Sequence, residues 1–197
     1  MGKYDGLSIG LFGGSFNPAH AGHMHVARCG IDPLGLDRVF WLTAPQNPLK
    51  PKQPSYASRV KTVRALGLPP RMEVSHMERD FGTQYTIDLI RRAQAKHPKT
   101  RFVFLMGADS FEQLPRWKDW HEITERVPLA VIARGGDGKA PKPSNTTALM
   151  MADYRLPEAQ AHKLKNIPSP CWTFLTPPLN RLSSSSIRKA MAKRKTM

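Results

Sequence analysis

The stretch GGSFNPAHAGH, residues 13–23, decides how this chain is expected to fold and what it can bind. An apolar segment, residues 7–12, runs directly into it, and residues 24–28 after it have the composition of a helix. The pattern predicts a strand, a glycine-rich turn and a helix in succession. Such a junction exposes backbone N–H groups at the positive end of a helix dipole, where an anion is stabilised. Glycine also lets the backbone approach a phosphate closely.

The two histidines of this stretch, His20 and His23, are three positions apart and are expected on one helical face. Both imidazoles could then donate hydrogen bonds to the same phosphate chain. A zinc site is the alternative, but it needs three or four ligands with thiolate or carboxylate partners. The spacing places His25 on another face, so anion binding is favoured.

The extended motif GxFxPxHxGH, residues 14–23, resembles the signature of the nucleotidylyltransferase superfamily, which carries an HxGH motif. The resemblance implies an enzyme that binds ATP and transfers a nucleotidyl group. It implies that His20 and His23 donate to the α- and β-phosphates, and that both are catalytic together with Arg188. The ATP-binding residues that it predicts are Gly13, Gly14, Ser15, Phe16, His20, His23, Ser184, Ser185, Ile187 and Arg188.

A second stretch, LSSSSIR at residues 182–188, has the composition of a helix start. Serines that open a helix cap it and leave N–H groups for an anion, and Arg188 about one turn later can fork onto phosphate oxygens. The string resembles the ISSTxIR element of the same superfamily, with Leu182 for isoleucine and Ser185 for threonine. The resemblance implies that Ser184, Ser185 and Arg188 hold the β- and γ-phosphates. A plain serine-rich cap is the alternative.

Three further segments resemble the nicotinate-nucleotide adenylyltransferases within the superfamily. They are WLTAPQNPLK at residues 41–50, TQYTID at residues 83–88, and GADS at residues 107–110 followed by Leu114, Trp117 and Trp120. Each alone could be an ordinary loop, a helix cap or a pair of core tryptophans. Their order and spacing along the chain favour the family interpretation.

This resemblance assigns six residues to nicotinate mononucleotide: Asn47, Lys50, Tyr85, Thr86, Asp109 and Trp117. Asn47 and Lys50 would place its phosphate and sugar, and the loop of Tyr85 would offer backbone donors to the nicotinate carboxylate. Asp109 would bind ribose hydroxyls, and Trp117 would stack on the pyridine ring.

The rest of the chain alternates predicted strands and helices, which indicates an α/β fold with a mostly parallel, doubly wound Rossmann-like sheet and helices on both faces. We expect one domain over residues 1–197, with a surface excursion at about 135–145, an ambiguous segment at 149–165 and a basic C-terminal helix at 184–197. The predicted strands are 8–12, 39–42, 72–75, 102–106, 128–133 and 171–175, and the main predicted helices are 22–29, 55–66 and 86–96.

Composition limits the remaining classes. The net charge of +15 invites a nucleic-acid interpretation, but the basic residues are spread along the chain and no zinc-finger or RRM-type motif is present. A basic surface also suits phosphorylated substrates. No apolar run reaches the ~18 residues that span a bilayer, and no signal-like segment precedes the first predicted strand. We therefore expect a cytoplasmic protein with two reduced cysteines, no membrane or nucleic-acid partner, and leave a homo-oligomer open.

The implied reaction is adenylyl transfer from ATP to nicotinate mononucleotide, which yields nicotinate adenine dinucleotide (deamido-NAD) and pyrophosphate in NAD biosynthesis. The mononucleotide phosphate would attack the α-phosphorus in line. Because this nucleophile is already an anion, no general base is needed, and no covalent intermediate is implied. Mg²⁺ would bridge phosphate oxygens and keep most of its waters, so no protein metal ligands are expected. The alternatives are a nicotinamide mononucleotide or phosphopantetheine acceptor, a cytidylyltransferase, or a basic nucleic-acid-binding protein.

Overall fold

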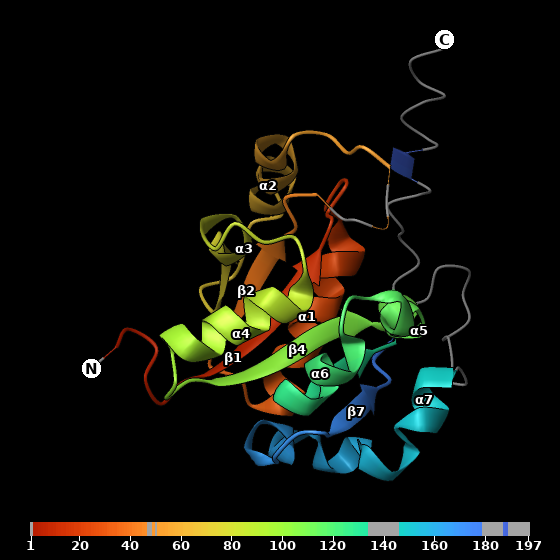
Figure 1. Ribbon diagram of the computed structural model, residues 1–197. Helices are drawn as coiled ribbons and strands as arrows, with labels where there is room; N and C mark the ends of the chain where they lie inside the picture. The colour runs from red at the N-terminus through yellow and green to blue at the C-terminus, as the bar shows by residue number, and fades with distance from the viewer. Residues whose placement is uncertain (1, 47–48, 50, 134–145, 179–186, 189–197) are drawn as a thin grey trace.

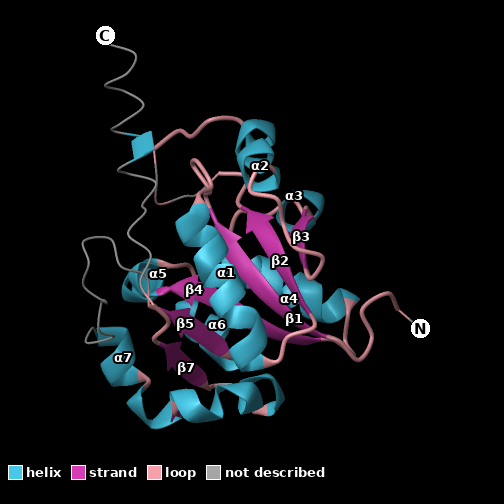
Figure 2. Cartoon of the chain, turned by 180° about the vertical axis from the view of Figure 1, so that it is seen from behind, coloured by secondary structure: helices cyan, strands magenta, loops and turns pink. Residues whose placement is uncertain are grey.

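The computed structural model describes residues 2–46, 49, 51–133, 146–178 and 187–188. Within them, seven parallel strands form one sheet in the order β3-β2-β1-β4-β5-β7-β6 (Figures 1 and 2). The strands are β1 Ser8–Gly14, β2 Arg38–Thr43, β3 Met72–Ser75, β4 Arg101–Gly107, β5 Leu129–Ile132, β6 Arg155–Leu156 and β7 Trp172–Leu175. This confirms the α/β class and the parallel, Rossmann-like sheet.

The helices that follow the strands cover both faces of the sheet (Figures 1 and 2). They are α1 Ala21–Leu34, α2 Tyr56–Arg64, α3 Met77–Asp80, α4 Thr86–Lys96, α5 Ala108–Gln113, α6 Trp120–Arg126 and α7 Thr146–Met150, with 3₁₀ segments at Leu114–Arg116, Ala152–Tyr154 and Glu158–Asn166. One apolar core packs α4, α5 and α6 on one face. The other core packs α1, α2 and the last 3₁₀ segment on the opposite face.

The central strands explain why this sheet forms. In β1 and β4 the residues Ile9, Leu11, Val103 and Leu105 are fully buried; Ile9 and Leu11 belong to one core, and Val103 and Leu105 belong to the other. Strands buried on both faces read as continuous apolar runs, which is the pattern that residues 102–106 show. A β-carbon on Gly10 would lie 2.9 Å from the side chains of Leu105 and Leu36, so any other residue at this position would displace the side chains packed over β1.

Three features differ from the sequence predictions. Helix α1 continues past residue 29 to Leu34, where Gly35 adopts a left-handed conformation and caps it. Helix α3 and the two-residue strand β6 were not predicted, because segments this short carry no periodic pattern. The excursion at 135–145 lies outside the described residues, as does the C-terminal helix at 184–197 apart from Ile187 and Arg188.

Candidate active site

The turn from β1 into α1 brings His20 and His23 together, as a pair of caps. His20 is the N-cap residue of α1, and its Nδ1 accepts the backbone N–H of Gly22 at 3.1 Å. His23 Nδ1 in turn accepts the backbone N–H of His20 at 3.3 Å. The ring centroids are 3.9 Å apart. Thus His20 lies just before the helix, a role that the one-face prediction did not anticipate.

These capping contacts decide which nitrogen of each neutral ring carries the proton. A nitrogen that accepts a backbone N–H has no proton of its own, so Nε2–H is the donor in both histidines. The first turn of α1 contains no acidic side chain. The positive end of the helix dipole is therefore not neutralised within its own turn, and two imidazole donors lie beside it.

The buried ring of Phe16 packs against His23. Its ring is 1% exposed, and it packs edge-on against His23 with centroids 5.1 Å apart, next to Phe12 and Trp41. Gly14 accommodates this ring, since a β-carbon there would lie 2.8 Å from it. The predicted contact of Phe16 with ATP is therefore left to its backbone, and its side chain belongs to the core.

Arg188 lies beside the same turn although it is distant in sequence. Its Nη1 donates to the backbone carbonyl of Asn17 at 2.7 Å. The described part of the chain thus brings the predicted C-terminal cation to the loop that precedes His20. Ile187 is adjacent and half-buried. The other predicted residues of this kind, Ser184 and Ser185, lie outside the described residues, as do Asn47 and Lys50.

A cavity of about 990 Å³, counting its open mouth, adjoins the end of β1. It gathers the described residues that were predicted for the mononucleotide together with three from the ATP set. The lining residues among the predictions are Gly13, Gly14, Ser15, Tyr85, Thr86, Asp109 and Trp117. His20, His23 and Arg188 are not part of this lining, but they lie at the turn that follows β1. Because the cavity includes the last residues of β1, the two predicted substrate regions meet at the carboxyl end of this strand. That end of a parallel sheet is where ligands of α/β folds bind.

Trp117 has the exposure needed for a stacking role. It is half-buried, lines the cavity, and meets Phe104 edge-on at 6.1 Å between centroids. Trp120 is half-buried and packs against the same core, and its ring also contacts His121. A tryptophan with one face on the core and another on a cavity can stack on a flat ring.

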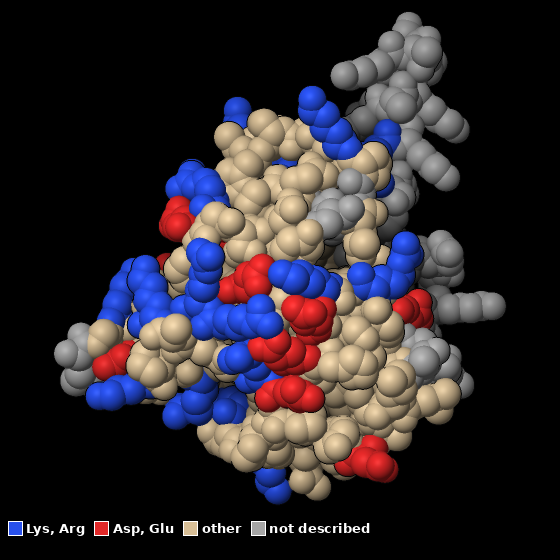
Figure 3. Space-filling view, in the orientation of Figure 1, with Lys and Arg blue, Asp and Glu red and all other residues tan. Residues whose placement is uncertain are grey.

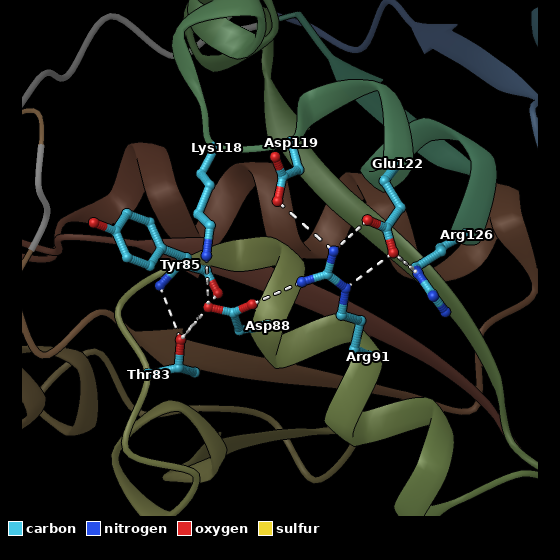
Figure 4. A network of polar contacts seen from close by, with 8 residues as sticks. All are labelled: Thr83, Tyr85, Asp88, Arg91, Lys118, Asp119, Glu122 and Arg126. Carbon is cyan, nitrogen blue, oxygen red and sulfur yellow. Dashed lines mark hydrogen bonds and ion pairs between the residues drawn. The ribbon is translucent and has the colours of Figure 1, made fainter.

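The loop that carries Tyr85 is held by a network of polar contacts (Figure 4). Thr83 Oγ1 accepts the backbone N–H of Tyr85 at 3.1 Å, and Lys118 lies over the Tyr85 ring at 4.8 Å. Lys118 also pairs with Asp88 at 3.5 Å. Asp88 continues through Arg91 to Glu122, which joins α4 to α6. Hydrogen bonds from Arg91 and Arg126 lower the pKa of Glu122 to about 2.

Two buried ionisable residues at this site were not predicted from the sequence. Arg59, on α2, is 1% exposed and donates to the backbone carbonyls of Ser15, Ala44, Pro45 and Pro54. It thereby ties together the loops that follow β1 and β2. The burial of Arg59 could have been suspected from the apolar residues Val60 and Val63 on the same helix. The carbonyl groups that accept its hydrogen bonds, however, lie 5–44 residues away along the chain. Such contacts leave no local pattern.

Glu78, on α3, is the second missed residue. It is 5% exposed and lines the cavity. Burial raises its pKa to about 8, against a smaller opposing effect of Arg59. Burial also lowers the pKa of the Arg59 guanidinium. No sequence signal distinguished this glutamate from an exposed one, because α3 is too short for a periodic pattern.

The charged surface is mixed. On the face shown in Figure 3, Lys and Arg are spread over the molecule, with acidic side chains among them. Near the cavity, Arg116 and Lys118 supply positive charge. Such a field raises the local concentration of anionic substrates. Within the described ranges, no helix is both long and apolar enough to cross a membrane.

Comparisons with known proteins agree with this geometry. The model of the cytidylyltransferase-like family matches residues 11–190. A relative from Ruegeria pomeroyi, named as a probable nicotinate-nucleotide adenylyltransferase, is 45% identical over 94% of this chain and 87% of its own length. A relative of the same name from Cereibacter sphaeroides is 43% identical over 92% of this chain and 96% of its own.

A solved structure shares the fold. It is Plasmodium falciparum nicotinic acid mononucleotide adenylyltransferase complexed with NaAD, with a TM-score of 0.71 and 16% identity. The match covers 93% of this chain and 83% of that one. The chain therefore belongs to the cytidylyltransferase-like family and, within it, to the nicotinate-nucleotide adenylyltransferases.

Proposed function

We propose that this enzyme transfers the adenylyl group of ATP to nicotinate mononucleotide, forming nicotinate adenine dinucleotide and pyrophosphate. One observation carries the proposal. The cavity lined by Tyr85, Asp109 and Trp117 opens at the same strand end as the His20–His23 turn. A mononucleotide in the cavity and a triphosphate at the turn would then have their reacting phosphates between the two.

The proposed chemistry follows from what these groups can donate. The mononucleotide phosphate attacks the α-phosphorus of ATP in line, the new P–O bond forms, and the bond to pyrophosphate breaks. The nucleophile is already an anion, so no side chain has to remove a proton. Nε2–H of His20 and His23, the start of α1 and the Arg188 guanidinium would stabilise the charge that builds on the phosphates.

A divalent metal suits this arrangement as a companion of ATP. Among the described residues, no group of three or more His, Cys, Asp or Glu side chains could form a metal cage. We propose that Mg²⁺ takes its ligands from phosphate oxygens and water, which is its usual behaviour with nucleotides. It would supply neutralisation of phosphate charge.

Pyrophosphate release tests the proposal. We expect turnover with ATP plus nicotinate mononucleotide, and much less with nicotinamide mononucleotide or phosphopantetheine as acceptor. CTP in place of ATP tests the cytidylyl alternative. A preference for any of these other substrates would contradict the proposal.

Arg188→Ala isolates the role proposed for the C-terminal cation. We expect the KM for ATP to rise about tenfold, the scale of one lost charge-assisted hydrogen bond, with little change in the KM for the mononucleotide. Arg155→Ala, which alters an exposed arginine on the edge strand β6, is the control. An unchanged KM for ATP would remove Arg188 from the triphosphate site.

A further inference from the structure

Glu78 is a buried acid that lines the cavity of Tyr85 and Trp117, and the proposed reaction does not use its carboxyl group. Its side chain is 5% exposed, and its Oε2 atom is buried without a hydrogen-bond partner in the described part of the protein. Among the same residues no lysine or arginine nitrogen forms an ion pair with it. A buried polar atom in this state is costly, so a ligand that supplies its partner is stabilised there.

The position of Glu78 indicates which part of the ligand it meets. It lines the cavity together with Gln84, Tyr85 and Thr86. Its backbone carbonyl also accepts the N–H of Thr83 at 3.0 Å, which joins α3 to that loop. The same loop is the one assigned by family resemblance to the nicotinate carboxylate. If the proposed function holds and this loop binds the nicotinate carboxylate, Glu78 lies near the pyridine substituent.

The charges around Glu78 come from several elements. Arg59 faces it from α2, but that guanidinium is already committed to four backbone carbonyls. Tyr56 of α2 is also within electrostatic range. On α3 itself, Arg79 and Asp80 are exposed and pair with each other. Across the cavity lie Asp109, Arg116 and Lys118.

The two pyridine mononucleotides differ at the group in question. Nicotinate carries a carboxylate, which only accepts hydrogen bonds and adds a negative charge. Nicotinamide carries an uncharged carboxamide, which can also donate. An uncharged acid donates its O–H to a carboxylate, whereas an ionised acid repels a carboxylate and accepts from an amide N–H.

We propose that Glu78 is a specificity-determining residue that discriminates the two substituents by its own protonation state. As the uncharged acid it donates its O–H to the carboxylate of nicotinate mononucleotide, and as the carboxylate it favours nicotinamide mononucleotide. This inference rests on the proposed function. The pKa of Glu78 near 8 means that the uncharged acid prevails at neutral pH.

The pH dependence of selectivity is the test. We measure kcat/KM for both mononucleotides with ATP from pH 6.5 to 9.5 and take the ratio of nicotinate to nicotinamide. The substrate phosphate titrates alike in both and cancels in the ratio. We expect the ratio to be constant to about pH 7 and to fall about tenfold by pH 9, the effect of one charged neighbour on a buried group.

Two variants sharpen this test. Glu78→Gln cannot ionise, so its ratio should not change with pH. Asp80→Asn removes an exposed carboxylate from the same helix and should leave the wild-type profile intact. A wild-type ratio that is flat with pH, or a Glu78→Gln ratio that falls as in the wild type, would overturn the inference.

Proton uptake provides a second measurement that needs no variant. Titration calorimetry at pH 8.5 in two buffers of different ionisation enthalpy gives the protons bound with each mononucleotide. Because the nicotinate carboxylate favours the uncharged acid, nicotinate mononucleotide should take up more protons than nicotinamide mononucleotide. Equal uptake would contradict the role of Glu78.

The outcomes separate the two proposals. If the enzyme fails to use nicotinate mononucleotide at pH 7, the proposed function is wrong, whatever the ratio does. If it uses nicotinate mononucleotide but the ratio and the proton uptake show no difference, only the role of Glu78 is wrong.

Discussion

Two regions lie at the end of β1: the turn that carries His20 and His23 (the histidine turn), and the cavity lined by Tyr85, Asp109 and Trp117 (the acceptor cavity). Different kinds of contact hold these two regions in place. In the turn, His20 and His23 cap the helix through contacts that span two or three residues. In the cavity, the loops are held by Arg59 and by the Asp88–Arg91–Glu122 network, whose longest contacts join residues 44 and 31 positions apart. Local contacts thus set the positions of His20 and His23, whereas long-range contacts hold the loops of the cavity.

Helix α2 joins the two regions. Arg59 Nη1 donates to the Ser15 carbonyl at 2.8 Å and Arg59 Nη2 to the Ala44 carbonyl at 2.7 Å. On the next turn, Thr62 Oγ1 accepts the backbone N–H of Ala19 at 3.0 Å. The turn that holds the histidines is therefore supported from outside its own segment.

Arg59→Ala should have the largest effect, because it breaks this connection. Four carbonyls lose their donor, and we expect the free energy of unfolding to fall on the order of 4 kcal/mol, since each buried unsatisfied acceptor costs about 1–3 kcal/mol. Urea unfolding followed by circular dichroism measures it. Arg64→Ala, an exposed arginine on the same helix, is the control. Equal stability of the two variants would show that the two regions are not joined through Arg59.

His23→Ala tests the histidine turn alone. We expect kcat to fall roughly 10²–10³-fold, the scale for losing one donor to a developing anion, while the KM for the mononucleotide stays nearly constant. Steady-state pyrophosphate release measures both. His25→Ala, which alters a half-buried histidine next to Cys29 in the same helix, is the matched control. A His23 variant within twofold of the wild type would leave His23 a capping residue only.

Trp117→Ala tests the cavity alone. Loss of a stacking surface should weaken nicotinate mononucleotide by roughly 1–3 kcal/mol, as for other bases on aromatic side chains, and leave ATP affinity unchanged. Titration calorimetry with each substrate measures this, and Trp117→Phe should retain most of the affinity. An unchanged affinity of the alanine variant would return Trp117 to the core.

Glu78→Gln tests how the buried acid makes the free energy of unfolding depend on pH. Its pKa is raised from 4.5 to about 8 in the folded protein, so the unfolded chain loses this proton first. The free energy of unfolding should therefore fall as pH rises from about 4.5 to 8, by about 2 kcal/mol between pH 6 and pH 8. Above pH 8 this contribution is constant. The variant should lack this decline, and unfolding curves at several pH values compare the two proteins. The same pH dependence in both would contradict the raised pKa of Glu78.

The sequence patterns predicted six of the seven described strands and the glycine-rich turn into α1, because both depend on local information. The apolar run of β4 and the glycine-rich turn with its two histidines each carry their signal within about ten residues. The cavity residues Tyr85, Asp109 and Trp117 were predicted from resemblance, and the structure brings them to one cavity. Arg59 and Glu78 were not found, since nothing beside them in the sequence marks a charged side chain as buried.

By itself, then, the sequence determined the parallel α/β architecture and the start of α1 at the two histidines, since strand burial and helix capping act between near neighbours. The tertiary structure decided that Arg188 reaches the loop before His20 and that Arg59 holds two loops. It also decided that Glu78 is buried, which raises the pKa of this carboxyl. The physical reason is desolvation: burial changes what a charged group costs, and burial is set by segments that are distant along the chain.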